Sequence, residues 1–224
     1  MQEWCDRYPG TPFFALIDKT DINCPNYGWV TFPWEVTPAD TPETAQYNIT
    51  RLLQYIGEDA TREGLLETPR RVIKAWNHWT KGYNESPAVT LKVFEDGGGN
   101  YDEMVVVRDI PIYSKCEHHL ADIFGTATIA YIPNGKIVGL SKLSRLADIF
   151  ARRLQVQERL TVQIADALME HLSPKGVGVV IKARHMCMES RGICQQGHHT
   201  VTSALRGVIK EDPQARAEFL SMNK

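Results

Sequence analysis

Apolar side chains recur at helical spacing in two segments between residues 41 and 85. The first segment opens with Thr41-Pro42 and ends before Gly57, and the second opens with Thr68-Pro69. Threonine in such a position caps free backbone N–H groups, and proline fits the first turn because it has no N–H to leave unpaired. The pattern predicts two amphipathic helices, which form an N-terminal helical region.

Further along the chain the pattern changes to β-rich runs. Runs at 89–94 and 104–113 flank the glycine-rich segment 96–100, which predicts a hairpin with a glycine turn. A second hairpin is expected over 125–140, with its turn at Pro133-Asn134-Gly135.

The C-terminal half alternates between the two kinds of element. Helices are expected at 141–154 and 157–172, strands at 177–188 and 200–209, and a short helix from Asp212-Pro213. Clustered helices and antiparallel strand signals favour an α+β fold over an alternating parallel sheet. We divide the chain into an irregular N-terminal extension (residues 1–40), the N-terminal helical region (41–85) and one α+β domain (86–224).

Composition narrows the class of protein. The chain has 224 residues, 43% of them hydrophobic, and a formal net charge of -2. The chain has no overall excess of basic residues that would favour nucleic acid or an anionic membrane as a partner. Its apolar runs are far shorter than the roughly 20 residues of a membrane helix. The acidic N-terminus fits no signal or transit peptide, so we expect a cytoplasmic location. The five cysteines are expected to be thiols or metal ligands.

A metal site is suggested by Cys116-Glu117-His118-His119, whose Cys-x-x-His spacing allows two side chains to hold one ion at a turn. Cys187 is the candidate third ligand, and strand alternation would put His185 on the same face, away from Met186 and Met188. Two thiolates and one imidazole suit zinc and leave a fourth position for water. Taken alone, the same spacing also fits a buried structural cysteine beside a surface histidine.

Several motifs in order resemble the GTP cyclohydrolase I family, from about residue 45 to the C-terminus. They are Gly57-Glu58-Asp59, Arg62-Glu63-Gly64-Leu65, Thr68-Pro69-Arg70-Arg71-Val72, Cys116-Glu117-His118-His119, Gly139-Leu140-Ser141-Lys142, Arg145, the run from Arg152 to Thr161, His185-Met186-Cys187-Met188 and Arg191-Gly192. The resemblance implies that Cys116, His119 and Cys187 hold one Zn²⁺ per subunit, whose water attacks C8 of the guanine of GTP. His118 and His185 would handle protons while the ring opens, formate leaves and the product becomes 7,8-dihydroneopterin triphosphate.

The resemblance also implies a substrate-binding set. Glu158 would accept hydrogen bonds from the guanine N1–H and 2-amino group, with assistance from Gln157. The remaining implied contacts, to the sugar and triphosphate, are Ser141, Lys142, Arg145, Arg191, Arg71 and Lys74. The implied architecture is the tunnelling fold (T-fold), an antiparallel sheet with paired helices on one side. Subunits of this family form two stacked rings, a homodecamer with active sites shared between neighbours.

Some features depart from the family pattern or stay open. Asp122-Ile123-Phe124 replaces a usual Pro-Phe pair, Thr128 stands where histidine is common, and the extension with Cys5 and Cys24 matches no known segment. A polar loop is the favoured interpretation of Cys194 and His198-His199, and an additional metal contact is the alternative. The alternative functions are another T-fold enzyme and a catalytically inactive, zinc-stabilised assembly or regulatory protein. Folate, tetrahydrobiopterin and 7-deazaguanine pathways could each use the product.

Overall fold

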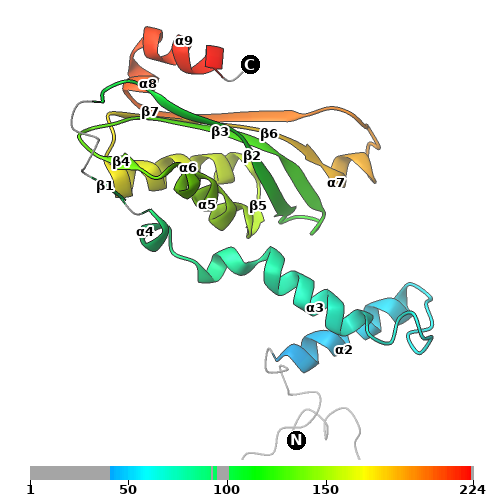
Figure 1. Ribbon diagram of the computed structural model, residues 1–224. Helices are drawn as coiled ribbons and strands as arrows, with labels where there is room; N and C mark the ends of the chain where they lie inside the picture. Colours follow the sequence, from blue (N-terminus) through cyan, green and yellow to red (C-terminus); the bar gives the residue numbers. More distant parts are fainter. Residues whose placement is uncertain (1–40, 92, 95–100, 223–224) are drawn as a thin grey trace, which may run out of the picture.

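A five-stranded sheet with strand order β5-β2-β3-β6-β7 lies at the centre of the computed structural model (Figure 1). The structure describes residues 41–91, 93–94 and 101–222. The expected irregular extension with Cys5 and Cys24, and the glycine turn at 96–100, therefore lie outside the described residues.

The register of the sheet brings three strand ends together. The strands are β2 (Val105–Cys116), β3 (Asp122–Ile132), β6 (Gly176–His185), β7 (Thr200–Gly207) and the two-residue β5 (Leu154–Gln155). Neighbours are antiparallel except for β5, which runs parallel to β2. Lys115 pairs with Asp122, and Ile123 pairs with His185. The end of β2, the start of β3 and the end of β6 therefore meet at one end of the sheet.

Two long helices cover one face of this sheet, and two shorter ones lie against the other face (Figure 1). Helices α5 (Leu140–Ala151) and α6 (Gln157–Leu172) bury their apolar side chains against the strands in the main core. Helices α8 (Val208–Glu211) and α9 (Pro213–Met222) close a smaller cluster around Phe219. The prediction of an α+β T-fold with paired helices on one side of an antiparallel sheet is confirmed.

The N-terminal helices α2 (Pro42–Tyr55) and α3 (Thr68–Trp79) pack on each other and project from the sheet (Figure 1). The Thr41 side chain caps α2 by accepting the backbone N–H of Thr44 at 3.2 Å, as the sequence predicts. Thr68 is the first residue of α3, and Glu67 takes the cap position that the sequence assigned to Thr68. Neither helix buries a residue completely, so their apolar faces stay largely exposed.

Both predicted hairpins are wrong. Residues 87–90 form the short helix α4 (Pro87–Thr90), which follows the 3₁₀ turn η1 (Lys81–Asn84). The two residues of β1 (Val93–Phe94) pair with β4 (Ile137–Val138) instead of with β2. The hairpin that forms is β2–β3, around the turn at 117–121. The β1–β4 ladder has only two residue pairs, so it leaves no periodic pattern in the sequence. The predicted hairpins instead paired β-rich runs that follow each other along the chain.

Two element ends also differ from the predictions. Helix α5 ends at Ala151, not at residue 154, because the chain becomes extended for its parallel pairing with β2. Strand β6 ends at His185, and residues Met186–Glu189 form the helical turn α7. Strand alternation therefore does not set the direction of the Cys187 side chain, contrary to the sequence argument.

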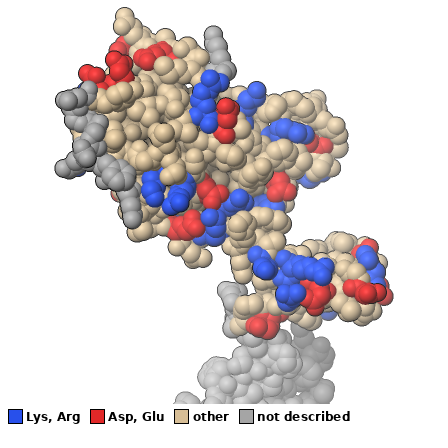
Figure 2. Space-filling view, viewed as in Figure 1, with Lys and Arg blue, Asp and Glu red and all other residues tan. Residues whose placement is uncertain are grey.

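In the described part of the chain, no helix has the length and apolar character that crossing a membrane demands. Figure 2 shows Lys and Arg side chains interspersed with Asp and Glu over the visible face.

Candidate metal centre and active site

The predicted metal motif lies in the tight turn between β2 and β3. Cys116 is the last residue of β2 and is buried. Its N–H donates to the carbonyl of Ala121 at 2.8 Å, and its carbonyl accepts the N–H of Leu120 at 2.8 Å. These two bonds close the turn on both sides of His118 and His119. Both imidazoles are therefore presented from a fixed backbone.

Cys116, His119 and Cys187 form the one group of three metal-ligating side chains found among the described residues, and these three are called the metal group below. One ligand atom from each lies within 4.8 Å of the others. Cys116 Sγ lies 3.9 Å from Nδ1 of His119, and α7 carries Cys187 toward them from the end of β6. Two sulfurs and one imidazole fit the ligand chemistry of a catalytic zinc site with one open position.

Burial, followed by the neighbouring Cys116 thiol, raises the pKa of Cys187 above its usual value. The positive charge of Arg191 acts in the opposite direction. A metal ion binds the thiolate, so proton release accompanies metal binding at this cysteine. The predicted substrate contact Arg191 therefore lies within electrostatic reach of the predicted metal ligands.

His118 lies beside the metal group, with its ring centroid 6.2 Å from that of His119 and the two rings nearly perpendicular. Its side chain is 64% exposed, and its Nε2 lies 3.8 Å from a carboxylate oxygen of Glu117. The other carboxylate oxygen of Glu117 accepts a short ion pair from Arg159. Glu117 therefore stands between an arginine of α6 and the candidate proton-transfer histidine.

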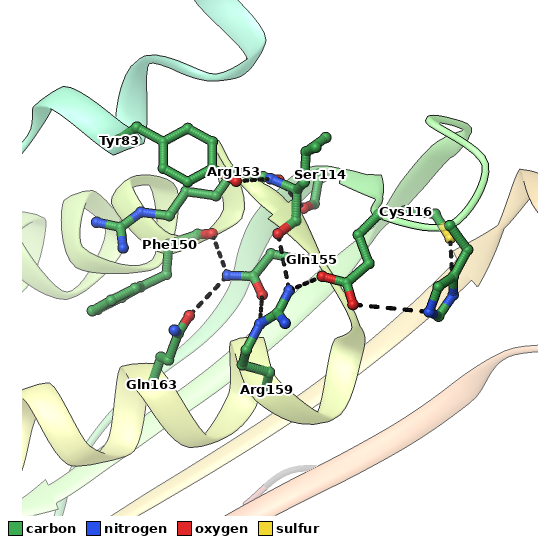
Figure 3. Close-up of polar contacts among 11 residues, drawn as sticks. Tyr83, Ser114, Cys116, Phe150, Arg153, Gln155, Arg159 and Gln163 are labelled. Carbon is green, nitrogen blue, oxygen red and sulfur yellow. Dashed lines mark hydrogen bonds and ion pairs between the residues drawn. The ribbon is translucent and has the colours of Figure 1, made fainter. Parts of the chain in front are cut away.

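A network of amide groups around Gln155 holds the Arg159 side chain (Figure 3). Gln155 is 1% exposed and donates to the Phe150 carbonyl at 2.9 Å and to Gln163 Oε1 at 2.8 Å. Its oxygen accepts from Arg159 Nε at 3.1 Å, and Arg159 also donates to the Leu154 carbonyl at 3.1 Å. The network ties the end of α5, strand β5 and the first turn of α6 to the turn between β2 and β3, which carries Glu117 and is called the metal turn below.

His185, the last residue of β6, faces the start of α6. Its Nε2 lies 2.7 Å from Oε1 of Gln157. Burial lowers the pKa of His185, an effect that the charge of Glu158 opposes and that of His198 reinforces. Glu158 is exposed in the first turn of α6 and lies within electrostatic reach of His185. The structure thus brings His185 and Glu158 into one neighbourhood.

Gln157 occupies a different position from the one that the sequence suggested. It is 1% exposed, and its amide nitrogen contacts the Ile181 carbonyl, the Thr200 carbonyl and Thr202 Oγ1. The side chain that was expected to assist base recognition thus lies inside the protein, between α6 and strands β6 and β7.

The start of α5, which carries the predicted contacts Ser141 and Lys142, lies far from the metal group within one chain. Helix α5 starts directly after β4, and the N–H of Val138 donates to the Tyr131 hydroxyl at 3.2 Å. Tyr131 stands eight strand residues along β3 from Ile123, the partner of His185, which corresponds to about 25 Å. Arg145 lines a separate cavity of about 570 Å³ with Lys81 and Asp148.

Ser141, Lys142, Arg71 and Lys74 are likewise outside this neighbourhood. Ser141 and Lys142 occupy the first turn of α5, beside β4. Arg71 and Lys74 are exposed in the first half of α3, whereas the last residue of α3, Trp79, contacts the sheet, with its ring centroid 3.7 Å from Lys115 Nζ. A single chain therefore assembles the metal group, both histidines, Glu158 and Arg191, but not the cations of α3 and α5.

The polar partners that position the site carry no signal that predicts them from the sequence. Arg184 and Glu189 make a forked ion pair across the turn before and after Cys187. Gln155 and Arg159 lay inside a recognised motif, yet their contacts depend on tertiary structure. His198 has a buried Nδ1 with no hydrogen-bond partner among the described residues, whereas Cys194 is exposed.

Comparison with known proteins agrees with this site. The family model described as GTP cyclohydrolase I matches residues 45–224. A protein from Janthinobacterium sp. named GTP cyclohydrolase 1 is 62% identical over 190 residues, which cover 85% of this chain and 96% of that relative. A Nitrosospira multiformis protein of the same name is 62% identical over 172 residues, covering 77% and 90%. A Nostoc sp. relative, GTP cyclohydrolase 1 2, is 53% identical over 188 residues, covering 83% and 86%. With the metal group and both histidines in place, this chain belongs to the GTP cyclohydrolase I family.

Proposed function

We propose that this protein is a zinc-dependent enzyme that opens the imidazole ring of GTP at C8, releases formate and forms 7,8-dihydroneopterin triphosphate. The observation that carries the proposal is the group of Cys116, His119 and Cys187, with His118 beside His119 and His185 at the end of the strand that leads into Cys187. The names of the relatives support GTP as the substrate.

The metal would be held by two thiolates and one imidazole, the three protein ligands of a catalytic zinc site. The chemistry that zinc supplies in such a site is a water whose pKa falls from about 15.7 toward about 7, which makes hydroxide available at neutral pH. Ring opening at C8 needs that nucleophile together with a proton donor to the ring nitrogen. His118 and His185 are the groups of this chain that can move those protons.

Recognition of the base falls to Glu158. Its carboxylate can accept two hydrogen bonds from the N1–H and 2-amino group of guanine, an edge that adenine does not offer. Its exposure in the first turn of α6, close to His185, supports this role. Arg191, near Cys187, would receive the phosphate end of the substrate together with cations from outside this chain.

We further propose that the enzyme is a homo-oligomer, two stacked rings of five chains, in which active sites are shared. The start of α5 lies beside β4, at the edge of the sheet about 25 Å along β3 from the strand position paired with His185. Lys142 would therefore serve the site of a neighbour, together with Arg145 on the same helix. Arg71 and Lys74 would do the same from α3. Exposed apolar side chains on the α2–α3 pair, among them Leu52, Tyr55 and Ile56, supply surface for such contacts. A cytoplasmic location and the absence of nucleic-acid or membrane partners stay predictions from the sequence.

Incubation of the zinc-loaded protein with GTP tests the activity, through formate release and the ultraviolet spectrum of the pterin. Cys187→Ala should abolish turnover, whereas Cys194→Ala, which changes an exposed cysteine outside the metal group, should retain it. Absence of turnover in a zinc-loaded, intact oligomer would instead favour the inactive assembly or regulatory protein.

Mixed oligomers test the sharing of sites. Cys187→Ala and Lys142→Ala chains should each be inactive alone and regain activity when they are dissociated and reassembled together. Only a site that combines residues of two chains can be complete in such a mixture. Mixtures that stay inactive, although wild-type protein survives the same reassembly, would show that each chain supplies its own site.

A further inference from the structure

The buried side chain of Gln157 has a single self-consistent hydrogen-bond arrangement. The amide atom assigned as nitrogen lies 3.0 Å from the Ile181 carbonyl and 3.0 Å from the Thr200 carbonyl. Carbonyl oxygens only accept hydrogen bonds, so the atom facing both of them must be the NH₂ group. The opposite amide orientation would set an oxygen against two oxygens.

The hydroxyls around Gln157 lead to the same orientation. Thr161 Oγ1 lies 2.7 Å from the backbone carbonyl of Gln157 and must donate to it. Because that donation uses the only hydroxyl proton of Thr161, the 2.7 Å contact between the two threonine hydroxyls requires Thr202 to donate to Thr161. Thr202 Oγ1 is then left to accept from the Gln157 amide at 3.1 Å. The two protons of the amide are thus shared among three acceptors, and the opposite amide orientation would leave the two carbonyls without a donor.

The tautomer of His185 follows from this arrangement. With the NH₂ group directed at β6 and β7, the carbonyl oxygen of the Gln157 side chain faces His185 Nε2 at 2.7 Å. That oxygen carries no proton, so Nε2 must donate. The neutral ring of His185 therefore bears its proton on Nε2 and its lone pair on Nδ1.

We infer that Gln157 is a positioning residue that holds His185 as the Nε2–H tautomer, so that the ring accepts and returns protons at Nδ1. The inference rests on the proposed function and assigns the proton-transfer atom within it. Gln157 itself does not touch the substrate in this arrangement, because its NH₂ group is committed to β6 and β7 and the residue is 1% exposed.

The transfer through His185 uses one proton and one ring nitrogen. When the attacking water gives up a proton, its O–H bond breaks, the electron pair stays on the oxygen that attacks C8, and the proton bonds to Nδ1. The ring becomes an imidazolium, and Nε2–H stays bonded to Gln157. The same Nδ1–H bond breaks when the proton passes to the leaving group. Without Gln157 the ring could rotate or take the other tautomer, and the loss would fall on the chemical step and not on substrate binding.

A pair of variants separates this role from a structural one. Gln157→Met keeps the length of the side chain but removes the acceptor of His185, whereas Thr202→Val removes one acceptor of the amide and leaves His185 in place. We expect Gln157→Met to lower kcat by on the order of 10²- to 10³-fold with KM within about threefold of wild type, and Thr202→Val to change both by less than about threefold. A raised KM with unchanged kcat in Gln157→Met would make Gln157 a substrate contact and overturn the inference.

A direct measurement on the wild-type protein avoids any change to Gln157. Solid-state ¹⁵N NMR of the zinc-loaded, ¹⁵N-histidine-labelled protein reports which ring nitrogen of His185 is protonated, with His185→Gln to assign the signal. Protonated Nε2 and bare Nδ1 in the neutral ring are expected, and the reverse would refute the inference. This result does not depend on turnover of GTP, so failure of the tautomer and failure of the proposed activity can be told apart.

Discussion

Arg184 and Glu189 form a forked ion pair that closes the turn carrying Cys187. Arg184 Nε lies 2.8 Å from Oε1 of Glu189, and Nη2 lies 2.5 Å from Oε2. Glu189 is buried, and the guanidinium of Arg184 stacks 5.1 Å from the Phe124 ring centroid. The strand before Cys187 and the helical turn that contains it are thereby held to each other.

We expect Glu189→Gln to weaken zinc binding about 10- to 100-fold, because residues that orient a metal ligand typically have effects of that size. Competition with a chromogenic chelator measures the affinity without reference to turnover. Asp166→Asn is the matched control, since it breaks the Arg206–Asp166 ion pair away from the metal group. An equal loss of affinity in both variants would contradict a specific role of Glu189.

Arg159→Lys should lower kcat on the order of 10- to 100-fold while zinc content stays at one per chain. Lysine cannot reproduce the contacts of Arg159 to Glu117, Gln155 and the Leu154 carbonyl together, so Glu117 and the neighbouring His118 lose their fixed position. Steady-state kinetics and metal analysis provide the test, with Arg206→Lys as control. Unchanged kcat would show that the network only supports the fold.

Asp148 should contribute stability that is lost in acid. Burial raises the pKa of Asp148, but hydrogen bonds from Lys81 and Arg152 outweigh it and hold the pKa below the usual 3.8. The folded state therefore binds its proton more weakly than the unfolded state, and the contribution is present above about pH 4 and disappears as the pH falls further. Thermal unfolding between pH 3 and 6 should show a shallower acid loss for Asp148→Asn than for wild type. Equal slopes would contradict this.

Phe219→Ala should reduce the free energy of unfolding by about 3–5 kcal/mol, the usual cost of removing a buried aromatic ring. Phe219 is fully buried and packs α9 on the sheet face opposite α5 and α6. Leu220→Ala alters the neighbouring, 45% exposed side chain and should change stability by less than about 0.5 kcal/mol. Chemical denaturation measures both, and a similar cost for the two variants would show that α9 adds little packing.

The sequence predicted those elements whose signals are local and repeated. Helix α6 runs over the predicted 157–172, because its apolar positions persist for four turns and Pro174 and Gly176 follow. The group of Cys116, His119 and Cys187 was also predicted, because the motif in the β2–β3 turn is compact and the resemblance supplied the distant ligand.

The missed features depend on contacts between distant segments. Residues 93–94 and 137–138 contain too few positions to show a period, so their pairing could not be read from the sequence. Cys187 follows β6 without a glycine or proline to mark the change from strand to helical turn. The surroundings of Gln157 exist only once β6 and β7 lie beside α6, so composition and spacing gave no hint of its burial.

The first turn of α6 carries three consecutive side chains with three destinations. Gln157 reaches His185, Glu158 stays exposed near it, and Arg159 reaches the metal turn, because successive helical residues point about 100° apart. By the same geometry, inserting or deleting one residue here would redirect all three side chains at once, whereas a substitution changes only one of the three contacts.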